Sequence, residues 1–188
     1  MANTQVQPGV RNIPDAGAYD LDPTHSYVAF TARHLMVTKV RGRFPVVGGQ
    51  LVVNDDASLS SVEATIDVSA VESGDPNRDE HLRSADFFDT ENHRYATFRS
   101  TSVEDHGDGE FTLQGDLTIR DVTRPVSLKG EYLGTQVSPW GDTRIGFSAE
   151  ADVSRKEWGL EWNLALETGG VVVGDKIKLV IDAEWIRN

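Results

Sequence analysis

The sequence contains no cysteine among its 188 residues. A disulfide scaffold, a thiolate zinc site and a cysteine nucleophile are therefore excluded. Long hydrophobic runs are also missing: the longest, Tyr27 to Phe30, is far shorter than the roughly 20 apolar residues of a membrane-spanning helix. Residues 1–15 show no basic stretch followed by an apolar one, so we expect no secretory signal and a cytoplasmic location.

Basic residues are scarce, since 18 Lys and Arg face 30 Asp and Glu and give a net charge of −12. The phosphates of a nucleic acid would repel such a chain, so we expect no nucleic-acid partner. One stretch reverses this balance, because no carboxylate lies between Asp22 and Asp55. It holds four basic residues: Arg33, Lys39, Arg41 and Arg43. These could guide an anionic head group to one rim, but alternation with Phe44 favours a solvated outer face.

The dominant pattern is an alternation of apolar and polar residues. It is clearest in residues 62–68, 111–119, 145–153 and 177–185. Weaker alternation runs through residues 28–34, 40–53, 97–103 and 126–132. Each stretch predicts a strand with one buried face, and the short polar turns between them favour antiparallel hairpins. We therefore predict an all-β fold, an antiparallel barrel of about eight strands, in preference to a sandwich, because closure removes exposed edges.

Residues 73–94 break the alternation. Asp75 is a suitable N-cap and Pro76 suits the first position of a short helix, while Ser84–Asp89 could form a second short turn. The expected fold thus has one or two short helices in a connecting segment. The adjacent Phe87 and Phe88 would cover an open end of the barrel. We divide the chain into a flexible tail, residues 1–16, and a single domain, residues 17–188.

Catalytic signatures are absent, with no nucleophile elbow, metalloprotease helix, phosphate loop or dinucleotide fingerprint. The histidines show no ligand spacing, and we expect no metal site. His34 shares its parity with Val28, Phe30 and Ala32, which predicts an inward side chain. It is interpreted either as a buried histidine bonded to the backbone or as a polar group that meets the head of a bound amphiphile.

Several ordered motifs resemble one known family. They are Tyr19-x-Leu21-Asp22-Pro23-x-His25-Ser26-x-Val28-x-Phe30, then Arg78-Asp79-x-His81-Leu82-x-Ser84-x-Asp86-Phe87-Phe88-Asp89, Tyr95-Ala96-Thr97-Phe98, Gly115-Asp116-Leu117-Thr118-Ile119, Val122-Thr123-Arg124-Pro125-Val126 and Arg155-x-x-Trp158-Gly159-Leu160. Together these resemble the YceI-like family of lipocalin-like, polyisoprenoid-binding proteins, from about Tyr19 to Trp185. The resemblance implies a lipocalin-like antiparallel barrel whose interior holds a long isoprenoid or another amphiphilic lipid. It also allows a homodimer and a transient contact with a membrane.

The inward positions include many small residues, which we expect to leave space along the barrel axis. They are Ala32, Gly42, Ala64, Gly115, Gly130, Ala149 and Ala151. We therefore predict binding, sequestration or transport of an isoprenoid lipid, such as an isoprenoid quinone, with no cofactor and no catalysis. The predicted ligand-binding residues are Val28, Phe30, His34, Phe44, Ile66, Phe87, Phe88, Phe98, Leu117, Phe147, Trp158 and Ile181.

Two alternatives remain at this point. The first is an enzyme that modifies such a lipid, with His34 or His81 as general acid or base. The second is a barrel filled by its own side chains that acts as an interaction module. A continuous cavity would separate a binding protein from this second alternative.

Overall fold

A computed structural model describes residues 13–167 and 169–188. The strands in this part are β1 (Gly17–Leu21), β2 (Tyr27–His34), β3 (Thr38–Val53), β4 (Ser61–Asp67), β5 (Tyr95–Gly107), β6 (Glu110–Ile119), β7 (Val122–Val137), β8 (Thr143–Ser154) and β9 (Val173–Arg187). The helical elements are α1 (Pro76–Arg83) and the 3₁₀ turns η1 (Ala57–Leu59), η2 (Val68–Ala70) and η3 (Arg155–Trp158).

The strands close into an antiparallel barrel. Consecutive strands from β2 to β9 pair as neighbours, and β9 returns to pair with both β1 and β2. Because β1 and β2 each lie antiparallel between β3 and β9, they form one interrupted strand, and the barrel has eight strand positions. The prediction of a lipocalin-like all-β barrel is confirmed. No helix in the described ranges is long and apolar enough to cross a membrane.

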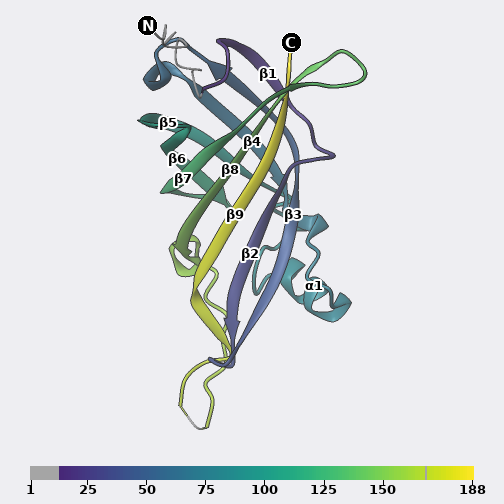
Figure 1. Cartoon of the computed structure of the whole chain (residues 1–188). Coiled ribbons are helices and arrows are strands. Elements are labelled where there is room, and N and C mark those ends of the chain that lie inside the picture. Colours follow the sequence, from purple (N-terminus) through teal and green to yellow (C-terminus); the bar gives the residue numbers. More distant parts are fainter. Residues whose placement is uncertain (1–12, 168) are drawn as a thin grey trace, which may run out of the picture.

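The helix α1 begins where the sequence predicts. The Asp75 carboxylate accepts hydrogen bonds from the backbone N–H groups of Asn77 and Arg78, and Pro76 occupies the first turn. Arg83 donates to the Ser69 carbonyl at 2.7 Å, which ties α1 back to η2. Residues 84–88 form turns rather than a second helix. In Figure 1, α1 lies beside the lower part of β3.

The interruption between β1 and β2 is built around a buried carboxylate. Asp22 accepts hydrogen bonds from Thr24 and His25, and Arg144 of β8 approaches it at 2.5 Å. Arg144 also contacts Glu184 of β9. Burial would raise the pKa of Asp22, but the hydrogen bonds from Thr24, His25 and Arg144 hold it well below its usual range. The Asp22-Pro23-x-His25 motif therefore links the break between β1 and β2 to Arg144 of β8 and Glu184 of β9.

Asp22→Asn should reduce stability at neutral pH by about 1–3 kcal/mol, because it unpairs buried hydrogen bonds. A depressed folded-state pKa gives stability that is present above the unfolded-state pKa and lost as pH falls below about 4. Urea unfolding across that pH range should show a smaller acid-dependent loss in the variant than in the wild type. Asp20→Asn, an exposed change on β1, serves as the control. If Asp22→Asn lost as much unfolding free energy on acidification as the wild type, Asp22 would not be the stabilising carboxylate.

Candidate functional site

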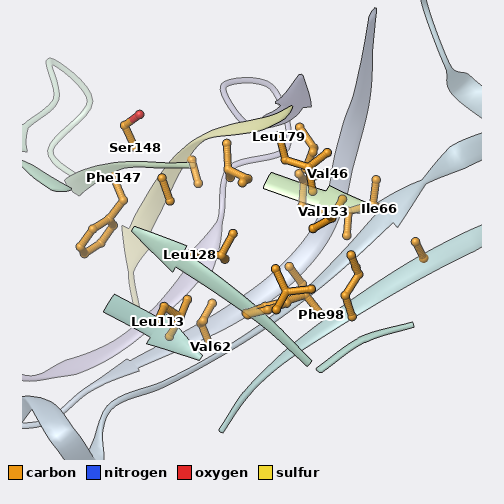
Figure 2. A pocket seen from close by; sticks show the side chains of 18 of the residues that line it. Val46, Val62, Ile66, Phe98, Leu113, Leu128, Phe147, Ser148, Val153 and Leu179 are labelled. Carbon is orange, nitrogen blue, oxygen red and sulfur yellow. The ribbon is translucent and has the colours of Figure 1, made fainter. Parts of the chain in front are cut away.

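The barrel encloses a cavity of about 340 Å³ that is lined by the inward faces of its strands. This volume lies within the range of about 300–1,000 Å³ typical of small-molecule sites. Figure 2 shows side chains such as Val62, Ile66, Leu113 and Leu128 converging from several strands, and the Ser148 hydroxyl is the one labelled polar group. The interior is therefore hollow and apolar. The alternative interpretation, a barrel filled by its own side chains, is therefore wrong for this chain.

The structure brings together all the predicted ligand-binding residues except one. The residues that line the cavity are Val28, Phe30, Phe44, Ile66, Phe87, Phe88, Phe98, Leu117, Phe147, Trp158 and Ile181. His34 does not line it. It is the last residue of β2 and stays in regular register with Thr38 of β3, while the pairing of β2 with β9 shifts between Ala32 and His34. His34 is half-buried, and its role, like the binding role of the other residues, stays a prediction.

The glycines on the inner wall do not leave the space that the sequence suggested. A Cβ atom at Gly42, Gly115 or Gly130 would collide with a phenylalanine ring of the neighbouring strand. The three rings belong to Phe30, Phe98 and Phe111. The outer end of each ring therefore rests on a glycine of the wall. The lumen stays open because the rings are held back from the axis, while Ala64 and Ala149 contribute small side chains directly.

One end of the lumen is closed by η3 and the chain that follows it. Trp158 is 1% exposed and donates its indole N–H to the Leu117 carbonyl at 2.9 Å. The buried Arg155 donates to the carbonyls of Leu160, Trp162 and Gly174 and faces Asp175. Burial lowers the pKa of Arg155, and Asp175 opposes this effect. The Arg155-x-x-Trp158-Gly159 motif thus closes this end of the lumen. Gly159 ends η3 with a left-handed φ of 73°.

The same end is covered by the segment after α1. Phe87 packs in a cluster with Trp158 and Leu160, and Phe88 meets the Phe44 ring edge-on with centroids 5.1 Å apart. His81 packs edge-on against the Phe87 ring of this layer, with centroids 5.1 Å apart. The His81 ring also packs against Trp162, with ring centroids 4.5 Å apart, and its Nε2 lies 2.9 Å from the Asp86 carboxylate. The phenylalanines cover one barrel end, as the sequence suggested, whereas His81 does not line the cavity.

The opposite end has a polar, accessible rim. Cavity-lining residues there include Asn54, Ser60, Asp105 and Glu110, and both carboxylates are exposed. Ile13 and Pro14 also line it, although the sequence assigns them to a flexible tail. The rest of that predicted tail, residues 1–12, lies outside the described residues. We refer to this end, between η1 and the β5–β6 turn, as the mouth.

A second polar cluster lies away from the lumen. Ligand atoms of Asp22, His25 and Glu184 lie within 4.8 Å of one another. Arg144 contacts both carboxylates, so it already supplies the positive charge that a metal ion would bring. This arrangement acts as an ion-pair network at the β1–β2 break.

Sequence reasoning missed two groups of lining residues. Phe111, Leu113 and Leu179 lie on strands whose alternation marks them as inward, so the signal for them was present. The mouth residues Asn54, Ser60 and Asp105 come from turns or a strand end, where periodicity carries no information. Their convergence depends on the three-dimensional closure of the barrel.

The fold and the apolar lumen define a class, the lipocalin-like barrels with an internal cavity. Comparison with known proteins is more specific, because the YceI-like domain matches residues 19–185. A UPF0312 protein of Vibrio cholerae is 34% identical over 143 residues, which cover 76% of each chain. Protein YceI of Escherichia coli O157:H7 is 33% identical over 169 residues, or 89% of this chain and 85% of that one. The chain belongs to the YceI-like family.

Solved structures share the architecture. BcnA of Burkholderia cenocepacia superposes with a TM-score of 0.75 at 19% identity, covering 87% of this chain and 98% of BcnA. A domain from Saccharophagus degradans, described as a polyisoprenoid binding domain implicated in plant cell wall breakdown, gives a TM-score of 0.67 at 16% identity. That match covers 93% of this chain and 100% of the domain. At these identities the likeness concerns the fold.

Gly115→Ala should destabilise the barrel by about 1–3 kcal/mol, because the added methyl group displaces the Phe98 ring from the wall. Urea unfolding measures the change. Gly48→Ala is the matched control, since a Cβ at Gly48 meets nothing within 4 Å. Equal stabilities for the two variants would show that the ring does not rest on Gly115.

Proposed function

We propose that this protein binds a long-chain isoprenoid or a similarly shaped lipid inside the barrel and holds or carries it without chemical change. The observation that carries the proposal is the continuous apolar lining of a lumen that is closed at one end. Membership of the YceI-like family supports it. The solved domain from Saccharophagus degradans, with the same fold, is described as polyisoprenoid-binding.

Burial of the chain supplies the binding energy. Each methylene removed from water contributes about 0.8 kcal/mol, and an apolar wall needs no specific polar partner to obtain it. Phenylalanine side chains that line the lumen, such as Phe98 and Phe111, offer apolar surface to the methyl branches of a prenyl chain. A lumen of this kind selects for length and width rather than for a particular functional group.

A binding role is preferred to catalysis because the candidate acid–base groups lie outside the lumen. Neither His34 nor His81 lines the cavity, and His81 is engaged with Asp86 and Trp162. At the closed end the Arg155 guanidinium is satisfied by backbone carbonyls and Asp175. A general acid or base acts only within hydrogen-bonding reach of the reacting atom, and the position of both histidines outside the cavity lining supports a binding role.

The mouth favours a lipid whose polar head is uncharged. Its polar lining consists of hydroxyl, amide and carboxylate groups, including Ser60, Asn54, Asp105 and Glu110. The basic residues Arg33, Lys39 and Arg41 lie toward the other end of β2 and β3. A quinone, phenol or alcohol would therefore meet hydrogen-bonding groups, whereas a diphosphate would meet like charge. We therefore expect the head group of the lipid in the lumen to lie at the mouth and not at the basic stretch.

Mass spectrometry of organic extracts tests the proposal directly. Protein purified without detergent from a host that makes prenyl lipids should yield an apolar lipid in a near-stoichiometric amount. Ala149→Phe should lower its yield and its affinity by about tenfold or more, because the ring occupies lumen that the prenyl chain needs.

Ser127→Phe provides the matched control, since Ser127 is an exposed residue of the adjacent strand β7. This variant should retain wild-type lipid content. Lipid-free extracts from the wild type, or equal lipid content in the two variants, would argue against binding in the lumen.

Competition binding tests the preference for an uncharged head. A prenyl quinone should bind more tightly than a prenyl diphosphate of the same chain length. Asp105→Asn combined with Glu110→Gln should narrow that difference by improving diphosphate binding, because it removes two negative charges from the mouth. An unchanged ratio of the two affinities would show that the head group does not lie near Asp105 and Glu110.

A further inference from the structure

An exposed apolar turn joins β2 to β3 near the lower end of the barrel, above the yellow loop that precedes β9 (Figure 1). Leu35, Met36 and Val37 are 39%, 51% and 75% exposed. The loop before β9 adds Leu164, which is 57% exposed, and braces the turn because the Leu35 N–H donates to the Val172 carbonyl at 2.8 Å. We call these four side chains the apolar tip. Large exposed aliphatic side chains gathered at one projecting point indicate an interaction site.

The backbone of this turn is unsuited to its side chains. Leu35 and Met36 have φ angles of 51° and 63°, and the Val37 N–H donates to the His34 carbonyl at 3.1 Å. Two consecutive positive φ angles characterise the type I′ hairpin turn, for which Asn-Gly is preferred. Leucine and methionine are strained in this region. A sequence selected for stability alone would not place them here, and such outliers are found at functional positions.

The tip is flanked by basic residues without acidic partners. Arg33, Lys39 and Arg41 are exposed, and Arg33 pairs in register with Lys39. None of the three makes an ion pair within the described ranges, whereas Arg43, further along β3, is paired with Glu72 at 2.7 Å. The adjoining loop contributes two exposed carboxylates, Glu161 and Glu167. In a chain of net charge −12, this hairpin is a local region of positive potential.

We propose that the apolar tip docks onto a lipid bilayer that carries anionic head groups. The aliphatic side chains would enter the interface while Arg33, Lys39 and Arg41 lie among the phosphates, the combination that gives reversible membrane attachment. This goes beyond lipid binding in the lumen and does not depend on it. The cavity extends to Ala32 and Val173 at this end, so docking holds the end covered by α1 close to the membrane.

Charge argues against a second copy of the chain as the occupant. A two-fold contact would bring the same patch from both subunits together, and the unpaired cations of one tip would face those of the other. A membrane surface instead offers dense negative charge together with an apolar layer directly beneath it. The tip matches both features of that surface.

Co-sedimentation with lipid vesicles tests the proposal. The wild-type protein should bind vesicles of phosphatidylcholine mixed with phosphatidylglycerol and bind phosphatidylcholine alone much more weakly. Binding should also fall as salt is added. Lys39→Gln and Arg41→Gln should each weaken binding by about fivefold, and Glu167→Gln should strengthen it by a similar factor.

The decisive variant is Leu35→Asn combined with Met36→Gly. It supplies the residues that a type I′ turn prefers, so the melting temperature should rise while vesicle binding falls more than tenfold. Trp140→Ser is the control, because Trp140 is 85% exposed on the β7–β8 turn at the opposite end of the barrel. It should leave vesicle binding unchanged.

Three results would overturn the proposal. One is the absence of vesicle binding by the wild type, and another is equal binding by the wild type and the double variant. The third is a dimer in sedimentation velocity that the double variant dissociates, which would assign the tip to self-association. Lipid content measured on the same samples reports on the lumen independently, so failure of docking would leave the proposed function intact.

Discussion

Phenylalanine rings lying on glycines keep the interior of this barrel open. The Phe30, Phe98 and Phe111 rings each occupy the position where a Cβ of Gly42, Gly115 or Gly130 would stand. An eight-stranded barrel is narrow enough for inward side chains to fill it completely. Because the end of each ring fits over a glycine, the rings add apolar surface beside a cavity that remains open. Cavity, lining and proposed ligand all depend on this contact between neighbouring strands.

The two ends of the lumen differ, because one is closed and the other has a polar rim. Arg155, Trp158 and Phe87 close one end through buried hydrogen bonds and packing, while Asp105 and Glu110 leave a polar rim at the other. A lipid that enters with its chain first would keep its head at the mouth. The basic apolar tip lies at the closed end, so attachment to a membrane and exposure of the head group are separated along the molecule.

Capping chemistry predicted the start of α1, and alternation predicted the strands other than β1 (Gly17–Leu21), because both signals are local. Alternation also placed Phe98, Leu117 and Ile181 on the inner face. Periodicity could not show where the cavity ends: His34 continues the register of β2 with β3, but the cavity lining on β2 stops at Ala32. Periodicity also could not reveal that Gly115 lies beneath a ring, since that depends on a residue of another strand. The family motifs marked Asp22 and Arg155, yet their function as fasteners of the fold became visible only through Arg144 and the carbonyl groups they meet.

A crystal structure of the protein purified without detergent from a prenyl-lipid-producing host tests the central claim most directly. The account predicts elongated electron density along the lumen, in contact with Phe98 and Phe147, with the phenylalanine rings resting on Gly42, Gly115 and Gly130. Rings turned inward to fill the axis, with no room for a chain between them, would contradict it.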